Sequence, residues 1–269
     1  MAPVAPIFPS PGKCIYCGAE PPSSGRLTDE HIIPEGLDGN SRILAASCAK
    51  CQEITSAVEG KCLGGVLRDA RIFAKIRGKK RKRAPRKFPI YHLGSDEPAM
   101  MVDANDYPEG FVMVNLPPPT LLVPRSPDEP ARYQGFEIQR NKYRGRADIF
   151  KDGVAITRNN IDLVLFARFL AKIAYCVSVA KFGLNSFESF LPPLILGETG
   201  EWSHFVGGYA PRHRIIDQAK KNLHTTAHYI NPESGQLSAD IQLLSRYGTP
   251  TYFVVVGRWT RRFFRVHRY

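Results

Sequence analysis

Two pairs of cysteines constrain the fold of this chain more than any other feature of its sequence. Cys14 and Cys17 form one C-x-x-C pair, and Cys48 and Cys51 form a second pair about 30 residues later. Each pair can occupy a tight turn, so that all four sulfur atoms reach one ion, and four thiolates complete the tetrahedral shell of Zn²⁺. We therefore expect one structural zinc site with no open position for a reactive water. The alternative is two pairs of buried, unmetallated thiols.

The rest of the sequence agrees with a reducing, aqueous setting. Six cysteines in 269 residues are too few for a disulfide scaffold, and the first residues lack the basic and apolar regions of a secretory signal. The longest apolar stretch, residues 161–180, is interrupted by Asp162, Arg168 and Lys172, which excludes an ordinary membrane span. We expect a cytoplasmic protein without a membrane partner, in which paired cysteines bind metal before they form disulfides.

The segment between the cysteine pairs contains residue types suited to hydrolysis. It includes Leu27-Thr-Asp-Glu-His-Ile-Ile-Pro34, followed by a glycine-rich turn that ends in Gly39-Asn40. A carboxylate directly before a histidine can place a metal ligand beside a general base. Phosphodiester hydrolysis uses both, because a hard cation offsets charge on the leaving oxygen while a neutral imidazole takes a proton from the attacking water.

This order of motifs resembles the HNH endonucleases that have a zinc-bound ββα-metal core. The resemblance covers about residues 13–75, a quarter of the chain. It implies metal-dependent hydrolysis of DNA with Mg²⁺ or Mn²⁺ as the catalytic ion. By the same resemblance, His31 is the general base, Glu30 is the acidic metal ligand before it, and Asp29 is an adjacent alternative ligand.

The second and third motif positions depart from the family pattern. The family's central asparagine would stand at Ile43, and the nearest asparagine is Asn40. The last motif residue, directly after the fourth cysteine, is Gln52, whose amide oxygen can also bind Mg²⁺. Thr55 and Glu59 share the helix face of Gln52 at i+3 and i+7, so Glu59 is a second candidate ligand.

Each of these candidates has a purely structural alternative. His31 could be a core histidine of a zinc-stapled module, and Asn40 could be a turn residue beside Gly39. Gln52 and Glu59 could belong to a solvated helix face. The corresponding alternative function is a zinc-containing DNA- or RNA-binding protein without nuclease activity.

A local run of basic residues accounts for most of the net charge of +12. Residues 75–87 contain nine basic and no acidic residues, and the rest of the chain contains 28 basic and 25 acidic residues. Such a run favours binding to phosphates without reading sequence. A solvated charge run and a nuclear-localisation signal are alternatives, although the arrangement is typical of a bacterial or phage protein. The expected DNA contacts are Lys79, Lys80, Arg81, Lys82 and Arg83.

The pattern of the chain changes after this run and predicts an α+β protein in two parts. Residues 1–88 are expected to form the HNH nuclease module with its basic extension. Residues 89–269 are expected to form an α+β domain whose role stays open, with target or partner recognition as one candidate. The oligomeric state stays open. Two helices are expected, one from Ser47 to about Ile76 and one from a cap at Asn159 to about Phe182, where Gly183 ends it. Strands are expected over 111–115, 135–139, 147–150, 237–243 and 252–257, with an edge strand over 259–269. Packing roles are expected for Cys62, Cys176, His224 and His228.

Overall fold

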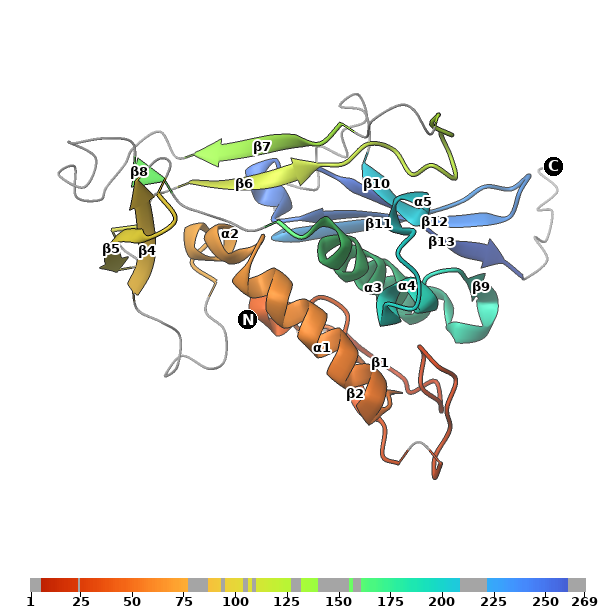
Figure 1. Cartoon of the computed structure of the whole chain (residues 1–269). Coiled ribbons are helices and arrows are strands. Elements are labelled where there is room, and N and C mark those ends of the chain that lie inside the picture. Colours follow the sequence, from red (N-terminus) through yellow and green to blue (C-terminus); the bar gives the residue numbers. More distant parts are fainter. Residues whose placement is uncertain are drawn as a thin grey trace.

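The computed structural model describes residues 6–23, 25–76, 87–92, 95–103, 106–107, 110–126, 132–139, 155–156, 161–208 and 222–260. Its helices and antiparallel sheets confirm the α+β class (Figure 1). The basic residues 79–83, Asn159 and the expected strand over 147–150 lie outside these ranges, as do residues 261–269 of the expected C-terminal edge strand.

The cysteine-rich segment folds as two strands and a helix. Strand β2 (Thr28–His31) pairs antiparallel with β3 (Arg42–Ser47), and the short β1 (Ile7–Phe8) pairs parallel with β3 on its other side. Helix α1 (Ala49–Gly64) begins directly after β3. This is the ββα order that the sequence motifs predicted.

The single helix predicted from Ser47 to about Ile76 is interrupted. Helix α1 ends at Gly64, and α2 (Arg68–Phe73) begins after a turn. Paired glycines at 64 and 65 weaken the helix there. The guanidinium of Arg71 then donates to the Leu63 carbonyl oxygen over 2.9 Å and fixes the turn.

A five-stranded antiparallel sheet forms the largest layer of the fold. Its path is β10 (Val206–Gly208), β13 (Tyr252–Trp259), β12 (Gln236–Leu243) and β11 (His224–Ile230), and β9 (Phe187–Ser189) pairs with β13. The strands expected over 237–243 and 252–257 are therefore confirmed. The side chain of Asn231 accepts hydrogen bonds from the backbone of Glu233 and Ser234, which closes the turn between β11 and β12.

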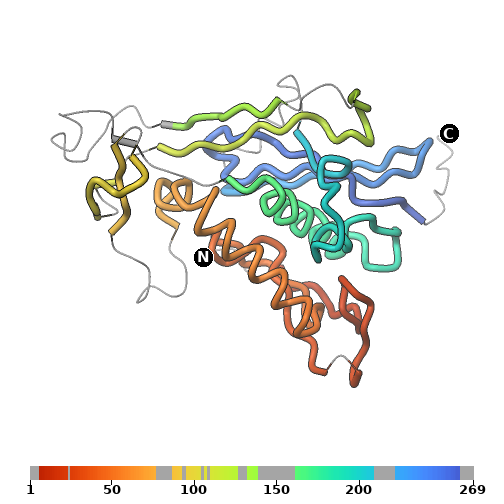
Figure 2. The backbone as a smooth tube through the Cα atoms, in the orientation of Figure 1, coloured from red at the N-terminus to blue at the C-terminus, as the bar shows by residue number. Residues whose placement is uncertain are grey.

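Helix α3 (Leu163–Phe182) lies between α1 and this sheet, as the backbone view also shows (Figure 2). Asp162 caps it by accepting a 2.9 Å hydrogen bond from the Leu165 amide. Gly183 ends it with φ 82°, as predicted. The helix is long and apolar enough to cross a membrane, but 72% of its most apolar 18-residue stretch is buried inside the fold. It is therefore the core helix.

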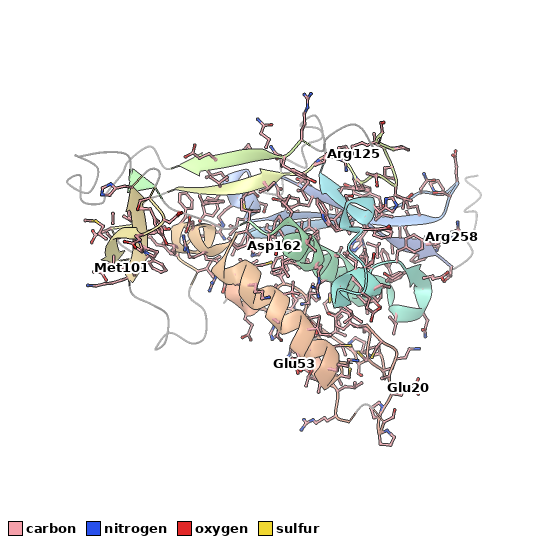
Figure 3. All side chains as sticks on the ribbon, in the orientation of Figure 1. Glu20, Glu53, Met101, Arg125, Asp162 and Arg258 are labelled. Carbon is pink, nitrogen blue, oxygen red and sulfur yellow. The ribbon has the colours of Figure 1, made fainter. Side chains whose placement is uncertain are left out.

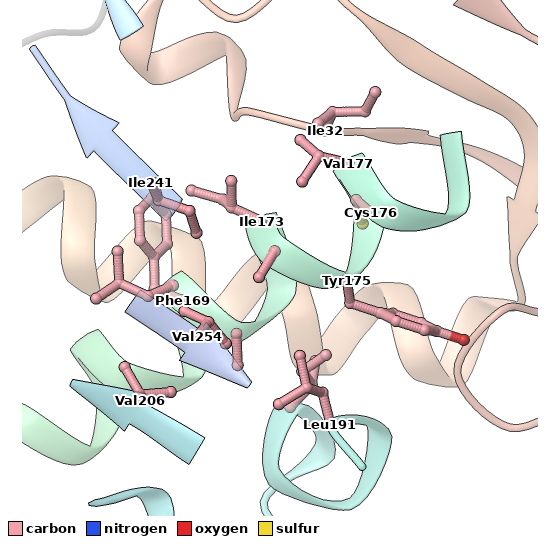
Figure 4. Packing of buried hydrophobic residues seen from close by; sticks show 14 of the residues in the cluster. Ile32, Phe169, Ile173, Tyr175, Cys176, Val177, Leu191, Val206, Ile241 and Val254 are labelled. Carbon is pink, nitrogen blue, oxygen red and sulfur yellow. The ribbon is translucent and has the colours of Figure 1, made fainter. Parts of the chain in front are cut away.

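The packing around α3 joins the first segment of the chain to the last. Figure 4 shows Ile32 beside Val177 on one side of the helix, and Ile241 and Val254 near Phe169 on the other. All of these residues belong to one hydrophobic cluster. The division of the chain at residue 88 stays a prediction.

Two smaller sheets and several short helices complete the described fold. Strands β6 (Gly110–Asn115) and β7 (Gln134–Gln139) pair antiparallel as a two-stranded sheet at the predicted positions. Strands β4 (Lys87–His92), β5 (Pro98–Asp103) and β8 (Ala155–Ile156) form a sheet around a separate small cluster of Ile90, Val102 and Tyr107. The short helices are η1 (Glu35–Leu37), η3 (Leu184–Ser186), α4 (Pro192–Leu196), α5 (Trp202–Phe205) and η4 (Ser245–Tyr247).

Candidate metal centre and catalytic cluster

The four cysteines of the two C-x-x-C pairs come together as predicted. Their sulfur atoms all lie within 4.8 Å of one another, and the sulfurs of Cys17 and Cys48 are 3.7 Å apart. Four thiolates at about 2.3 Å from Zn²⁺ stand about 3.8 Å from one another in a tetrahedron. The cluster can therefore hold one metal ion of this kind.

Local backbone structure places each pair. The Gly18 amide donates to the Cys14 carbonyl oxygen over 2.9 Å, and Gly18 takes φ 74°, which closes the first turn. The second pair opens α1, with Cys48 as its N-terminal cap. Burial raises the pKa of the Cys14 and Cys51 thiols. A divalent cation counters this effect because it binds the thiolate form directly.

Strand β2 separates the three candidate residues onto two faces. Glu30 points inward and is 5% exposed, whereas Asp29 and His31 are only half-buried. Asp29 lies at a bulge in the β2–β3 pairing, where its carboxylate accepts a 3.1 Å hydrogen bond from the Ala45 amide and lies 3.4 Å from Arg42. Asp29 and Glu30 therefore do not share one site.

Glu30 instead belongs to a buried ionic cluster with Lys172 of α3 and Glu59 of α1. The Lys172 ammonium lies 2.8 Å from a carboxylate oxygen of Glu30 and 2.8 Å from one of Glu59. It also donates to the backbone carbonyl oxygen of His31. Burial alone lowers the pKa of Lys172, but the attraction of the two carboxylates outweighs it and the pKa rises above its ordinary value. The ammonium is therefore fully charged.

His31 lies at the end of β2 with one ring nitrogen near the surface. Its Nε2 atom is 3.3 Å from a carboxylate oxygen of Glu35, the first residue of η1, and both side chains are about one third exposed. The Nδ1 atom is buried and has no hydrogen-bond partner among the residues that the structure describes. The strand partner of His31 is Arg42, whose side chain is 42% exposed. The pairing places these two residues opposite one another at the end of the two strands, where both side chains are partly exposed, and the Arg42 guanidinium lies beside the Asp29 carboxylate.

The other two motif candidates lie apart from these groups. Asn40 is exposed in the loop that leads into β3, and Gln52 is half-buried in the first turn of α1. Within the described ranges, no hydrogen bond or ion pair joins either side chain to Glu30, His31 or Glu59. The turn before Asn40 requires glycine, because a Cβ atom at Gly39 would come within 1.9 Å of the Ile33 carbonyl oxygen.

The sequence interpretation missed Lys172 as a site residue. The lysine stands in the middle of an apolar helix, and such a charge needs a buried counter-ion. That conflict was the signal available in the sequence. The two carboxylates that resolve it come from segments more than 100 residues away, and no local pattern identifies them.

A cavity of about 610 Å³ lies between the β2–β3 loop, α3 and β11. His224 and His228 both line it. His224 accepts from the Leu244 amide through Nδ1 at 3.2 Å, so its Nε2 donates to the Leu37 carbonyl oxygen at 2.7 Å. His228 packs edge-on against Phe182. These contacts are those expected of packing residues.

No family model, no curated protein and no solved structure matches this chain. The resemblance to HNH endonucleases therefore rests on its motifs, and the structure adds the tetracysteine cluster and the ββα order around it.

Proposed function

We propose that this protein hydrolyses phosphodiester bonds in DNA as an HNH-type endonuclease, with His31 as the general base. One observation supports this function above the others. The tetracysteine cluster gathers residues that flank one end of the β2–β3 pair, and His31 stands at the opposite end of β2 with Nε2 near solvent and Glu35 beside it.

The residues around His31 suit attack of water on a phosphate. Because Nδ1 is buried, Nε2 is the ring nitrogen that meets solvent. Rotation of the half-exposed Glu35 side chain would admit a water between the two groups, and Nε2 would then take its proton. Arg42, opposite His31 on β3, would bind the phosphate through its guanidinium.

The two metals expected from the resemblance fit this structure unequally. Zinc fits the tetracysteine cluster, where it stabilises the fold. A catalytic Mg²⁺ does not fit at Glu30, because the ammonium of Lys172 already lies 2.8 Å from that carboxylate in a buried position. We therefore assign no step of the reaction to an ion at Glu30.

This same contact favours a second candidate function, a zinc-containing DNA- or RNA-binding protein that does not cut. In that case the basic run holds the nucleic acid, and the buried cluster serves only stability. The two functions predict the same binding and differ in turnover.

Nicking of supercoiled plasmid separates the two candidates. Purified, zinc-loaded protein is incubated with plasmid in Mg²⁺, in Mn²⁺ and in EDTA, alongside His31→Ala and the control His92→Ala, which changes an exposed histidine on β4. Cutting by the wild type and by His92→Ala, but not by His31→Ala, supports the nuclease. Tight binding without cutting in every condition supports the second candidate.

A further inference from the structure

Helix α3 contributes one charged side chain to the interior of the ββα segment. Lys172 is 2% exposed, and it reaches Glu30 on β2 and Glu59 on α1 from a helix more than 100 residues further along the chain. Burial of an ammonium is costly unless its donors all find acceptors. We therefore expect oxygen atoms of opposite or partial negative charge around this ammonium group.

Three oxygen atoms surround the ammonium group of Lys172. One carboxylate oxygen of each glutamate lies 2.8 Å away, and the backbone carbonyl oxygen of His31 accepts a hydrogen bond. The contact with Glu59 is an ion pair and not a hydrogen bond, because the buried Oε1 atom has no hydrogen-bond partner among the described residues. Carboxylate and carbonyl oxygens are also the ligands that hard divalent cations take in proteins. These oxygen atoms therefore form a site that suits a cation, and the ammonium group of Lys172 occupies it.

The formal charges of Lys172, Glu30 and Glu59 agree with a lysine side chain serving as the cation of this site. One ammonium and two carboxylates leave one formal negative charge. The side chain of Glu59 is 20% exposed, so the residual charge is partly solvated, whereas that of Glu30 is only 6% exposed. A divalent ion would have to displace Lys172 from the packed core around α3, because both cations need the same oxygen atoms.

We propose that the Lys172 ammonium substitutes for a divalent cation between Glu30 and Glu59, so that these carboxylates do not bind Mg²⁺ or Mn²⁺ in the wild-type protein. The same ammonium holds the end of β2, through the His31 carbonyl oxygen, and Lys172 is thereby a positioning residue. This inference concerns occupancy of the site, and it holds whether or not the protein cuts DNA.

Binding of Mn²⁺ tests the proposal without any assay of cutting. Free Mn²⁺ is measured by electron paramagnetic resonance, and thermal unfolding is followed with and without Mn²⁺, with zinc content checked in each sample. The matched proteins are the wild type, Glu30→Gln, Lys172→Met, and Lys172→Met combined with Glu30→Gln and Glu59→Gln. Methionine keeps the length of the lysine stem without its charge.

We expect the wild type and Glu30→Gln to bind Mn²⁺ equally weakly. Lys172→Met should bind Mn²⁺ at least ten-fold more tightly and gain thermal stability from it, because two carboxylates then face one another without a cation. The triple variant should bind Mn²⁺ no more tightly than the wild type does, and Mn²⁺ should not change its thermal stability.

Two results would overturn the proposal. One is a wild-type protein that binds one Mn²⁺ and loses it on Glu30→Gln substitution. The other is a folded Lys172→Met protein that responds to Mn²⁺ no more than the triple variant does. If Lys172→Met does not fold even with Mn²⁺, the comparison of wild type with Glu30→Gln still decides the question. Failure of the protein to cut DNA would leave each of these readouts unchanged.

Discussion

The hydroxyl group of Tyr175 on α3 donates a 2.5 Å hydrogen bond to the backbone carbonyl oxygen of Ile15, 160 residues earlier in the chain. Ile15 stands between the two cysteines of the first pair, and its neighbour Tyr16 lies 3.4 Å from the sulfur of Cys176. Burial raises the pKa of Cys176 to about 12, so this thiol stays neutral and acts as a packing residue. The segment between Cys14 and Cys17 is therefore hydrogen-bonded directly to helix α3.

Loss of the metal should therefore destabilise the whole core and not just one loop. Cys17→Ser removes a thiolate whose side chain is exposed, so little packing is lost with it. Structural zinc is worth about 10–16 kcal/mol in zinc-finger peptides, and we expect Cys17→Ser to lose at least about 3 kcal/mol of unfolding free energy. For a chain of this size that lowers Tm by about 6–12 °C.

Calorimetry together with elemental analysis measures both effects. Ser23→Ala, an exposed change on the same loop, is the control and should keep both zinc and Tm. Purified protein that contains no zinc before chelation would contradict the metal assignment.

His31→Ala should slow cutting strongly and leave DNA binding unchanged. The substitution removes the base but keeps the tetracysteine cluster and the basic run, so single-turnover cleavage should fall at least about 100-fold, the usual contribution of a general base. Affinity for the same duplex, measured by fluorescence anisotropy, should change less than two-fold. Undiminished cleavage by a folded, zinc-loaded His31→Ala protein would falsify the role of this histidine.

The metal cluster and the secondary structure could be predicted because their signals are local. Two C-x-x-C pairs need only short turns to bring four sulfurs together, and the alternating apolar residues of 237–243 located strand β12. The alternation also predicted a half-buried strand, which is wrong, because Ser238 and Asp240 on the polar face are buried as well. Gly183 has no Cβ and tolerates the positive φ that ends α3. Each of these inferences depends on neighbours in the chain.

The environment of Glu30 could not be predicted, because it is decided by a distant segment. The motif placed Glu30 and Asp29 as alternatives for one role, but successive residues of a strand point to opposite faces, and the Asp29 carboxylate bonds to the Ala45 amide instead. The cation beside Glu30 comes from α3, and its identity depends on how that helix packs. A resemblance that ends near residue 75 carries no information about it.

Stability should fall as pH decreases from 7 to 4, because of His228. Burial, with a smaller contribution from Lys181, lowers the pKa of this imidazole from 6.5 to about 4. Between these values the unfolded chain binds a proton that the folded protein excludes, so unfolding becomes easier as pH falls. The shift corresponds to at most about 3 kcal/mol.

The substitution His228→Phe keeps an aromatic ring against Phe182 and removes the titrating group. Urea unfolding at several pH values should show a shallower loss of stability in His228→Phe than in the wild type. The same substitution at the exposed His92 should leave the pH dependence unchanged. Equal slopes in wild type and His228→Phe would show that another group is responsible.

The basic run should bind DNA without sequence preference. Replacing Lys79, Lys80, Arg81, Lys82 and Arg83 with glutamine removes up to five phosphate contacts. Each lost contact should make the negative slope of log affinity against log salt less steep by about 0.9. This change should be equal for duplexes of different sequence. Lys50→Gln with Lys61→Gln, two exposed positions on α1, serves as the control for charge loss elsewhere. A changed sequence preference with an unchanged salt slope would mean that the run reads bases.

The last prediction concerns Glu30, for which the HNH resemblance and the structure expect different results. If Glu30 binds a catalytic metal, Glu30→Ala should keep its stability, lose cutting and be rescued by excess Mn²⁺. If Glu30 balances Lys172, the substitution leaves a buried ammonium with one carboxylate, and it should lose about 3 kcal/mol of unfolding free energy. Glu53→Ala on the outer face of α1 is the control, and it should change stability by less than about 0.5 kcal/mol (Figure 3).

The structure favours the second outcome, because the 2.8 Å contact between Glu30 and Lys172 is buried and leaves the carboxylate no access to a solvated ion. Denaturant unfolding of the two variants, each with and without Mn²⁺, gives the answer. A stable Glu30→Ala protein whose cleavage returns with Mn²⁺ would restore Glu30 to the metal site. An unstable one that ignores Mn²⁺ would assign Glu30 to the core, where it joins α3 to the strand that carries His31.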